Sequence, residues 1–239
     1  MIHKDIFGEA IRDFYYKKHI EDIIVQAPDF DDDTIPIPYL FRPYEKMPPI
    51  EQKALDLSYG DVLDVGCGAG SHSLYLQDQK KLNVQAIDIS AGAIEICKKR
   101  GIIHASVQNI FELQQGSYDT LLFLMNGSGI IGKLNNIDHF FSTIKYFLKP
   151  GGQILMDSSD ISYLFTEEDG RFWVDSSATY YGEMLYKLGY KDLQSDWFNW
   201  LYIDYNTLQN AANANGFVCQ LLLLGEHNDY LAKITKKTS

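Results

Sequence analysis

The stretch Asp61-Val-Leu-Asp-Val-Gly-Cys-Gly-Ala-Gly70 decides the fold, because an apolar run breaks there into alternating glycines. The run up to Val65 has the length and β-branched content of a buried parallel strand, interrupted only by Asp64. Alternating glycines allow a tight turn and let a ligand approach the backbone N–H groups. A helical segment opens at Ser71. A strand, a glycine loop and a helix N-terminus in this order predict a nucleotide site at the carboxyl end of a parallel sheet.

The spacing of the glycines separates one kind of nucleotide site from another. A dinucleotide fingerprint requires Gly-x-Gly-x-x-Gly, but its sixth position here is Ser71. A Walker loop is excluded because no Gly-Lys-Ser/Thr follows the glycines. The remaining pattern, acidic-x-Gly-x-Gly-x-Gly, runs from Asp64 to Gly70. It resembles the first motif of the class I S-adenosylmethionine-dependent methyltransferases at every defined position. The competing interpretation is a glycine turn with a purely structural role.

The charge balance narrows the class of partner. Of 239 residues, 21 are Lys or Arg and 32 are Asp or Glu, so the formal net charge is −11. A phosphate backbone requires a basic face, which argues against a nucleic-acid partner. The three cysteines have neither zinc spacing nor the pattern of disulfides, which indicates a reducing cytoplasm. No apolar run reaches membrane-spanning length, the polar start is no signal peptide, and no metal site is expected.

From residue 61 onward, strands and helices alternate as in a doubly wound parallel sheet. The expected strands are 61–66, 83–88, 102–107, 117–125 and 153–157, followed by a final antiparallel hairpin at 217–224 and 230–234. The expected helices are 71–80, 90–100, 137–148 and 208–215, with Ser90 as an N-cap. The fold class is therefore α/β, with a mostly parallel, seven-stranded sheet.

The N-terminal region and one insertion depart from this alternation. Residues 1–27 predict one or two amphipathic helices, and residues 35–50 an irregular, proline-rich segment beside the ligand cleft. The acidic run Asp31–Asp33 is interpreted as a solvated loop. Residues 160–205 are rich in aromatics, with strands expected at 178–188 and 196–203 around a turn at Gly189. We expect one domain over 1–239: a helical cover (1–50), a Rossmann-like core (51–159 and 206–239) and an inserted β-rich lid (160–205).

The resemblance implies S-adenosyl-L-methionine as cofactor and a set of contact residues. Asp88 ends the second strand, where the family has an acidic residue on the ribose, and Ala86-Ile-Asp-Ile-Ser90 resembles the second motif. Asn109 and Ile110 stand where the family contacts adenine, with Gln108 as a competitor for Asn109; an amide oxygen can still accept from the adenine amino group. Asn126 lies where cofactor and substrate meet. The implied cofactor-binding residues are Asp64, Gly66, Cys67, Gly68, Gly70, Asp88, Ile89, Asn109, Ile110 and Asn126.

Two further cofactor contacts are proposed from the proline-rich segment. The methionine end of the cofactor carries a carboxylate, and Tyr39-Leu-Phe-Arg42 precedes the sheet in a loop stiffened by prolines. Arg42 is expected to pair with that carboxylate, with Tyr39 alongside. The alternative is an ordinary surface arginine.

No catalytic residue is assigned, but three candidates emerge. Tyr180 and Tyr181 are neighbours on an expected strand of the lid, so one side chain is expected to face an acceptor pocket together with Trp197 or Trp200. Asp157 ends the fifth strand, where substrates of such sheets bind, although helix capping would explain it equally well. The competing interpretations of the aromatic insertion are an ordinary core and a homodimer interface.

These patterns lead to a methyltransferase that acts on a small-molecule acceptor by direct in-line displacement. A non-catalytic nucleotide-binding protein and an NAD(P)-type oxidoreductase on the same sheet stay open as alternatives. The identity of the acceptor, the accepting atom, the existence of a general base and the oligomeric state are not fixed by the sequence.

Overall fold

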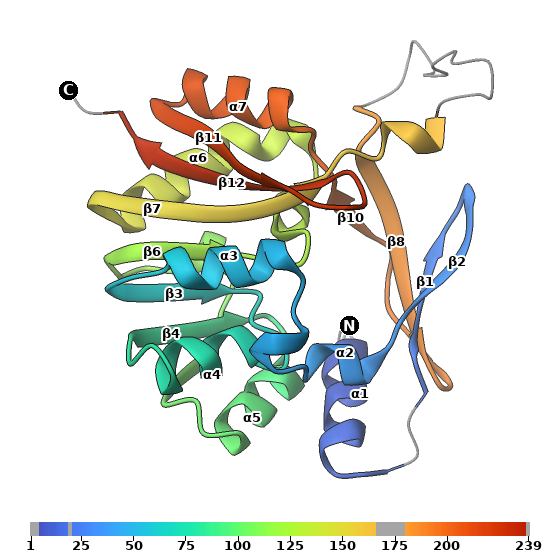
Figure 1. Ribbon diagram of the computed structural model, residues 1–239. Helices are drawn as coiled ribbons and strands as arrows, with labels where there is room; N and C mark the ends of the chain where they lie inside the picture. Colours follow the sequence, from blue (N-terminus) through green and yellow to red (C-terminus); the bar gives the residue numbers. More distant parts are fainter. Residues whose placement is uncertain (1–4, 19–20, 166–179, 238–239) are drawn as a thin grey trace.

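The computed structural model describes residues 5–18, 21–165 and 180–237, which form two sheets with flanking helices (Figure 1). The larger sheet has seven strands in the order β11-β12-β7-β6-β3-β4-β5. Strands β7, β6, β3, β4 and β5 are parallel, whereas β12 is antiparallel to both β7 and β11. The predicted α/β class, strand number and final antiparallel hairpin are confirmed. The bounds are β3 Asp61–Val65, β4 Asn83–Asp88, β5 His104–Val107, β6 Tyr118–Phe123, β7 Leu148–Ser159, β11 Phe217–Leu224 and β12 Asp229–Lys236.

Helices cover both faces of this sheet because its central strands bury side chains on both sides. On β3, Val62 packs with residues of α3 and α4, whereas Leu63 packs with residues of α6 and α7. Ser90 caps α5, since its hydroxyl accepts a hydrogen bond from Ala93 N at 3.0 Å. The longer helices are α3 Pro49–Leu57, α4 Ser71–Asp78, α5 Ala91–Lys99, α6 Ile137–Phe147 and α7 Tyr205–Ala214. Short turns are α2 Ile37–Leu40, η1 Tyr44–Lys46, η2 Ile110–Glu112, η3 Gly127–Ile131, η4 Leu134–Asn136 and η5 Ser162–Phe165.

The N-terminal region is only partly helical, which corrects the expectation for residues 1–27. Helix α1 (Ile6–Tyr15) is present, but the second apolar cluster forms strand β1 (Ile23–Ala27). The acidic run predicted as a loop lies within strand β2 (Phe30–Ile35). Both strands exist because β1 pairs with β2 on one side and with β8 on the other, and this pairing overrides the local pattern.

The aromatic insertion completes this second sheet instead of standing alone. Its strands are β8 (Glu183–Tyr190), β9 (Leu193–Gln194) and β10 (Phe198–Leu201), and the sheet order is β10-β8-β1-β2, with β9 paired to β8. Tyr180 and Tyr181 precede β8, so the expectation that they lie on a strand is wrong; Glu183 is its first residue. Phe172, Trp173 and Ala178, part of the predicted lid, lie outside the described residues. Figure 1 shows the second sheet standing across the carboxyl ends of the parallel strands.

Helix α1 joins the second sheet to the larger one. Asp5 caps α1 and also accepts from Gly92 N of α5 at 2.8 Å, where Gly8 and Gly92 let the two helices touch. On the other side of α1, the Asp13 carboxylate forms an ion pair with Lys191 Nζ at 2.5 Å, and the helix packs against the buried ring of Tyr190. The turn after β8 is therefore anchored to the body of the protein. In the part of the chain that the structure describes, no helix is long and apolar enough to cross a bilayer.

Candidate functional site

The glycine loop after β3 contains three glycines in the left-handed backbone conformation, and their surroundings differ. Gly66, Gly68 and Gly70 have φ values of +73°, +53° and +82°, which other residues rarely adopt. A β-carbon on Gly70 would lie 2.3 Å from Ile102 and 2.9 Å from Cys97, so this glycine permits close packing of the loop on α5. A β-carbon on Gly66 or Gly68 would meet one atom each, at 3.2 and 3.7 Å. The first two glycines therefore leave space on the open side of the loop.

Asp88 ties this loop to the start of α5. Its two carboxylate oxygens accept hydrogen bonds from Gly68 N at 2.9 Å and Ser90 N at 2.8 Å. Burial nevertheless raises the pKa of Asp88, because these two bonds offset the loss of water only in part. Each oxygen retains a lone pair for a further donor, as a ribose contact requires.

Asp64, the acidic residue of the first motif, lies beneath the loop. Its side chain is 2% exposed and accepts a hydrogen bond from Ser73 Oγ at 2.5 Å. Burial raises the pKa of this carboxyl. The bond from β3 to α4 fixes the direction in which the chain leaves the loop. Cys67 is buried as well, with its sulfur 3.8 Å from that of Cys97.

Arg42 lies in a buried charge cluster that the sequence did not indicate. Its guanidinium pairs with Glu51, donates to Tyr39 O at 2.5 Å and lies 3.6 Å from the centre of the Tyr39 ring. His72 Nε2 lies 2.8 Å from the second carboxylate oxygen of Glu51. Burial raises the pKa of Glu51, but His72 and Arg42 outweigh it, and the net pKa is lowered.

One donor of this cluster is left over. Arg42 is 6% exposed, so the alternative of an ordinary surface arginine is wrong. Among the described residues, Arg42 Nε is a buried side-chain nitrogen without a hydrogen-bond partner. A buried, unpaired N–H of a cation is costly, and an anionic ligand would satisfy it.

The residues expected around adenine take different positions at the ends of β4 and β5. Ile89, directly after β4, is 76% exposed, which is unusual for a large aliphatic side chain. Ile110 is buried in the core that also holds Phe123. The Asn109 side chain caps η2 by accepting from Phe111 N at 3.0 Å, and it retains its amide N–H₂ group.

The loop after β6 has an unusual backbone. Met125 and Asn126 both have left-handed φ values, +64° and +56°, which are costly for residues other than glycine. The Asp157 carboxylate holds this loop: it accepts from Met125 N at 3.0 Å and from Gly127 N at 2.9 Å. Burial raises the pKa of Asp157 to about 6. This geometry makes Asp157 a residue that positions the loop.

Hydrogen bonds link the same loop to the second sheet. Ser128 Oγ donates to Leu201 O at 2.8 Å and lies 2.7 Å from Ser158 Oγ, which in turn accepts from Ile203 N at 2.9 Å. The Asn126 amide donates to Leu201 O at 3.2 Å. The end of β10 is therefore fixed against the carboxyl end of β6.

The two tyrosine candidates are engaged in structural hydrogen bonds. Tyr180 donates to Asp204 at 2.6 Å, and Tyr181 donates to Asp160 at 2.9 Å. Burial raises the pKa of both phenols, so neither is a base near neutral pH. Trp200 packs over Gly129, where a β-carbon would meet its ring at 2.0 Å, whereas Trp197 is half exposed beside Lys187.

The comparisons with known proteins agree with this geometry. Residues 62–152 match the methyltransferase domain family. A solved SAM-dependent methyltransferase from Bacteroides fragilis, in complex with S-adenosyl-L-homocysteine, is 46% identical to this chain with a TM-score of 0.92. That similarity covers 98% of this chain and 96% of the other. This chain belongs to the S-adenosylmethionine-dependent methyltransferases.

Two further matches have lower sequence identity. The CcbJ methyltransferase from Streptomyces caelestis has a TM-score of 0.61 over 98% of both chains, but at 12% identity it shares the fold alone. Phosphoethanolamine N-methyltransferase 1 from Arabidopsis thaliana is 29% identical over 148 residues. That match covers 55% of this methyltransferase and 29% of the plant protein, so this chain spans less than a third of that relative's length.

Proposed function

We propose that this methyltransferase transfers a methyl group from S-adenosylmethionine to a small-molecule acceptor by direct in-line displacement. The position of the second sheet carries the proposal: it stands across the strand ends at which the glycine loop opens (Figure 1). An acceptor then enters between two protein layers, which suits a small molecule. The net charge of −11 disfavours a nucleic acid.

Three features of the chain support a fit to the donor. The open side of Gly66 and Gly68 admits a ligand, the exposed side chain of Ile89 offers an apolar surface, and Arg42 has an unpaired N–H. We assign the ribose to Asp88, the adenine to Ile89, Asn109 and Ile110, and the carboxylate to Arg42 with Tyr39 alongside. Asp64, Cys67, Gly70 and Asn126 shape the loops around these groups.

In the transfer step, the residues of this chain orient donor and acceptor and exclude water from between them. The bound donor supplies a methyl group that its sulfonium already activates. The loop at Met125–Gly127, held by Asp157, and β10, fixed by Ser128 and Ser158, set the distance between donor and acceptor sides. Orientation of this kind is worth several kcal/mol of the barrier, on the order of 7–11 kcal/mol at most.

Titration calorimetry tests the donor assignment. We expect S-adenosylhomocysteine to bind at a single site and NADH to give no saturable heat. Incubation with S-adenosylmethionine carrying a deuterated methyl group, followed by mass spectrometry of added small molecules, then tests transfer. Tight NADH binding without S-adenosylhomocysteine binding would contradict the proposal.

The Arg42→Ala substitution tests the carboxylate contact. We expect the affinity for S-adenosylhomocysteine to fall about tenfold, because a charge-assisted hydrogen bond to the carboxylate is lost. Adenosine lacks that carboxylate, so its affinity serves as the control for any disturbance of the Glu51 cluster. Equal losses for both ligands would show that Arg42 supports the fold without touching the carboxylate.

A further inference from the structure

The second sheet presents alternate side chains of its strands to the larger sheet. The register pairs Phe198 with Tyr186, and Trp200 with Met184. Trp200 packs on Gly129 of η3, so the face of the second sheet that carries Trp200 and the residues paired in step with it is turned toward the larger sheet. Leu188 lies on the same face of β8 and is paired with Val25 of β1, which is paired with Asp33 of β2, so these side chains share that face. We call this side the inner face. Gln26, Asp32 and Lys187 lie on the outer face.

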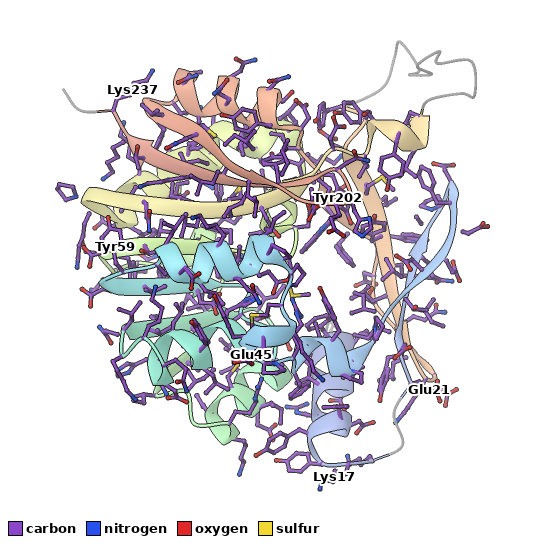
Figure 2. All side chains as sticks on the ribbon, in the orientation of Figure 1. Lys17, Glu21, Glu45, Tyr59, Tyr202 and Lys237 are labelled. Carbon is purple, nitrogen blue, oxygen red and sulfur yellow. The ribbon has the colours of Figure 1, made fainter. Side chains whose placement is uncertain are left out.

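The two ends of the inner face hold its most buried side chains. At one end Tyr190 and Ile23 belong to the apolar core around α1, and at the other Met184 is 7% exposed beside Trp200, which packs on Gly129. Among the described residues, none of the apolar clusters contains Tyr186 or Tyr202. Their hydroxyl oxygens lie 3.4 Å apart and their rings meet edge to face. Figure 2 labels Tyr202 between β8 and the carboxyl edge of the larger sheet.

Asp33 adds a negative charge to the inner face. The strand register places Asp33 on the inner face, where its side chain is exposed. Burial raises the pKa of Tyr186 and Tyr202, and the charges of Tyr163 and Asp33 add to both shifts. Within the described ranges, Asp33 forms no ion pair, and its carboxylate accepts only from Thr34 N, at 2.7 Å. The inner face thus combines aromatic rings, neutral hydroxyls and an exposed carboxylate that has no ion-pair partner among the described residues.

We propose that the acceptor of this methyltransferase is an amine, bound against Tyr186, Tyr202 and Asp33. This inference rests on the proposed function. Aromatic faces and a carboxylate together attract organic cations, and they repel carboxylates and phosphates. On the donor side, the positive charge of Arg42 is already paired with Glu51.

The charge movement of the reaction favours the same assignment. The lone pair of the free amine forms the new N–C bond while the S–C bond breaks and leaves its electron pair on sulfur. Positive charge thereby moves from the donor side to the acceptor nitrogen, and the product ammonium then releases its proton to water. Groups that stabilise a cation on the acceptor side stabilise the transition state more than the bound reactants.

Matched probes test this inference without requiring turnover. Choline is a quaternary ammonium that cannot be methylated, 3,3-dimethylbutan-1-ol replaces its nitrogen by carbon, and 3,3-dimethylbutanoate carries a negative charge. With S-adenosylhomocysteine present, we expect choline to bind at least about fivefold more tightly than the alcohol, as a cation–π site with a carboxylate requires. The carboxylate probe should bind most weakly. Equal binding of choline and the alcohol, or preferred binding of the carboxylate, would overturn the proposal.

A pair of substitutions on β2 locates the effect. Asp33→Asn should abolish most of the preference for choline, whereas Asp32→Asn removes the same charge from the outer face, where Asp32 accepts from Gln26, and should leave it intact. Both variants should bind S-adenosylhomocysteine as the wild type does. If the wild type does not bind S-adenosylhomocysteine, the proposed function itself is refuted. If S-adenosylhomocysteine binds and Asp33→Asn keeps the full preference for choline over the alcohol, only the amine site is refuted.

Discussion

Replacing Asp157 by alanine is expected to lower the turnover of methyl transfer by about hundredfold, the scale of a displacement of roughly 1 Å between reacting groups. The carboxylate satisfies the N–H groups of Met125 and Gly127 and stabilises two left-handed residues in succession. Without it, both N–H groups lose their acceptor and the loop relaxes toward ordinary backbone angles. Single-turnover rates at saturating donor measure the effect.

Asp157→Asn is the matched variant. Its amide oxygen still accepts one of the two N–H groups, whereas its N–H₂ group faces the other donor. We therefore expect turnover between those of the wild type and the alanine variant, with a smaller change in S-adenosylhomocysteine affinity than in rate. An alanine variant that turns over at more than half the wild-type rate would show that the loop holds its conformation unaided.

The titration of Asp157 gives a separate prediction about stability. Burial raises its pKa to about 6 in the folded protein, against 3.8 for an ordinary aspartate. The protonated form is therefore favoured by folding, and this contribution is complete below about pH 4 and is lost as the pH rises through about 6. Relative to Asp157→Asn, the wild type should lose about 3 kcal/mol of unfolding free energy across this range. Urea unfolding of both proteins at several pH values measures the difference, and parallel pH profiles would contradict it.

Asp88→Ala is expected to weaken S-adenosylhomocysteine binding by about 10–100-fold, corresponding to about 1.5–3 kcal/mol for charge-assisted hydrogen bonds. The carboxylate has two tasks, because it holds Gly68 of the loop and offers its remaining lone pairs to the ribose. Asp61→Ala is the control. It removes an aspartate from the opposite end of the same sheet, where Lys149 and Asn83 are its partners.

Calorimetry of the two variants separates binding from folding. The Asp61 variant should bind S-adenosylhomocysteine as the wild type does, since its ion pair is partly exposed and contributes little. If Asp88→Ala also retained full affinity, Asp88 would serve only to join the loop to α5, and the ribose contact would be refuted.

The core of the fold followed from local pattern because its elements carry their own signals. The strand at residues 83–88 and the hairpin begin where the sequence placed them, since apolar runs bounded by glycine or polar turns define them. The cluster at Ile23–Val25 was misassigned to a helix for the opposite reason. Its partner, β8, lies far along the chain, and apolar spacing over a few residues does not distinguish a short strand from a helical turn.

The candidate site also has a part that the sequence indicates and a part that only the folded chain brings together. The glycine loop and Asp88 are contiguous with the strands that position them, so spacing alone indicates them. The cluster of Glu51 and His72 around Arg42 arises from segments that meet only in the folded chain. The same holds for the inner face, where β2 meets β8 through β1. Tyr180 and Tyr181 are candidates because they are neighbouring aromatics in the insertion, yet their hydroxyls are bound to Asp204 and Asp160.

A crystal structure with S-adenosylhomocysteine bound tests the central claim most directly. The account predicts the ribose on Asp88, the adenine against Ile89, the carboxylate on Arg42 Nε and the sulfur directed toward the inner face at Tyr202. A ligand that occupies the glycine loop with its sulfur directed away from the second sheet would contradict it.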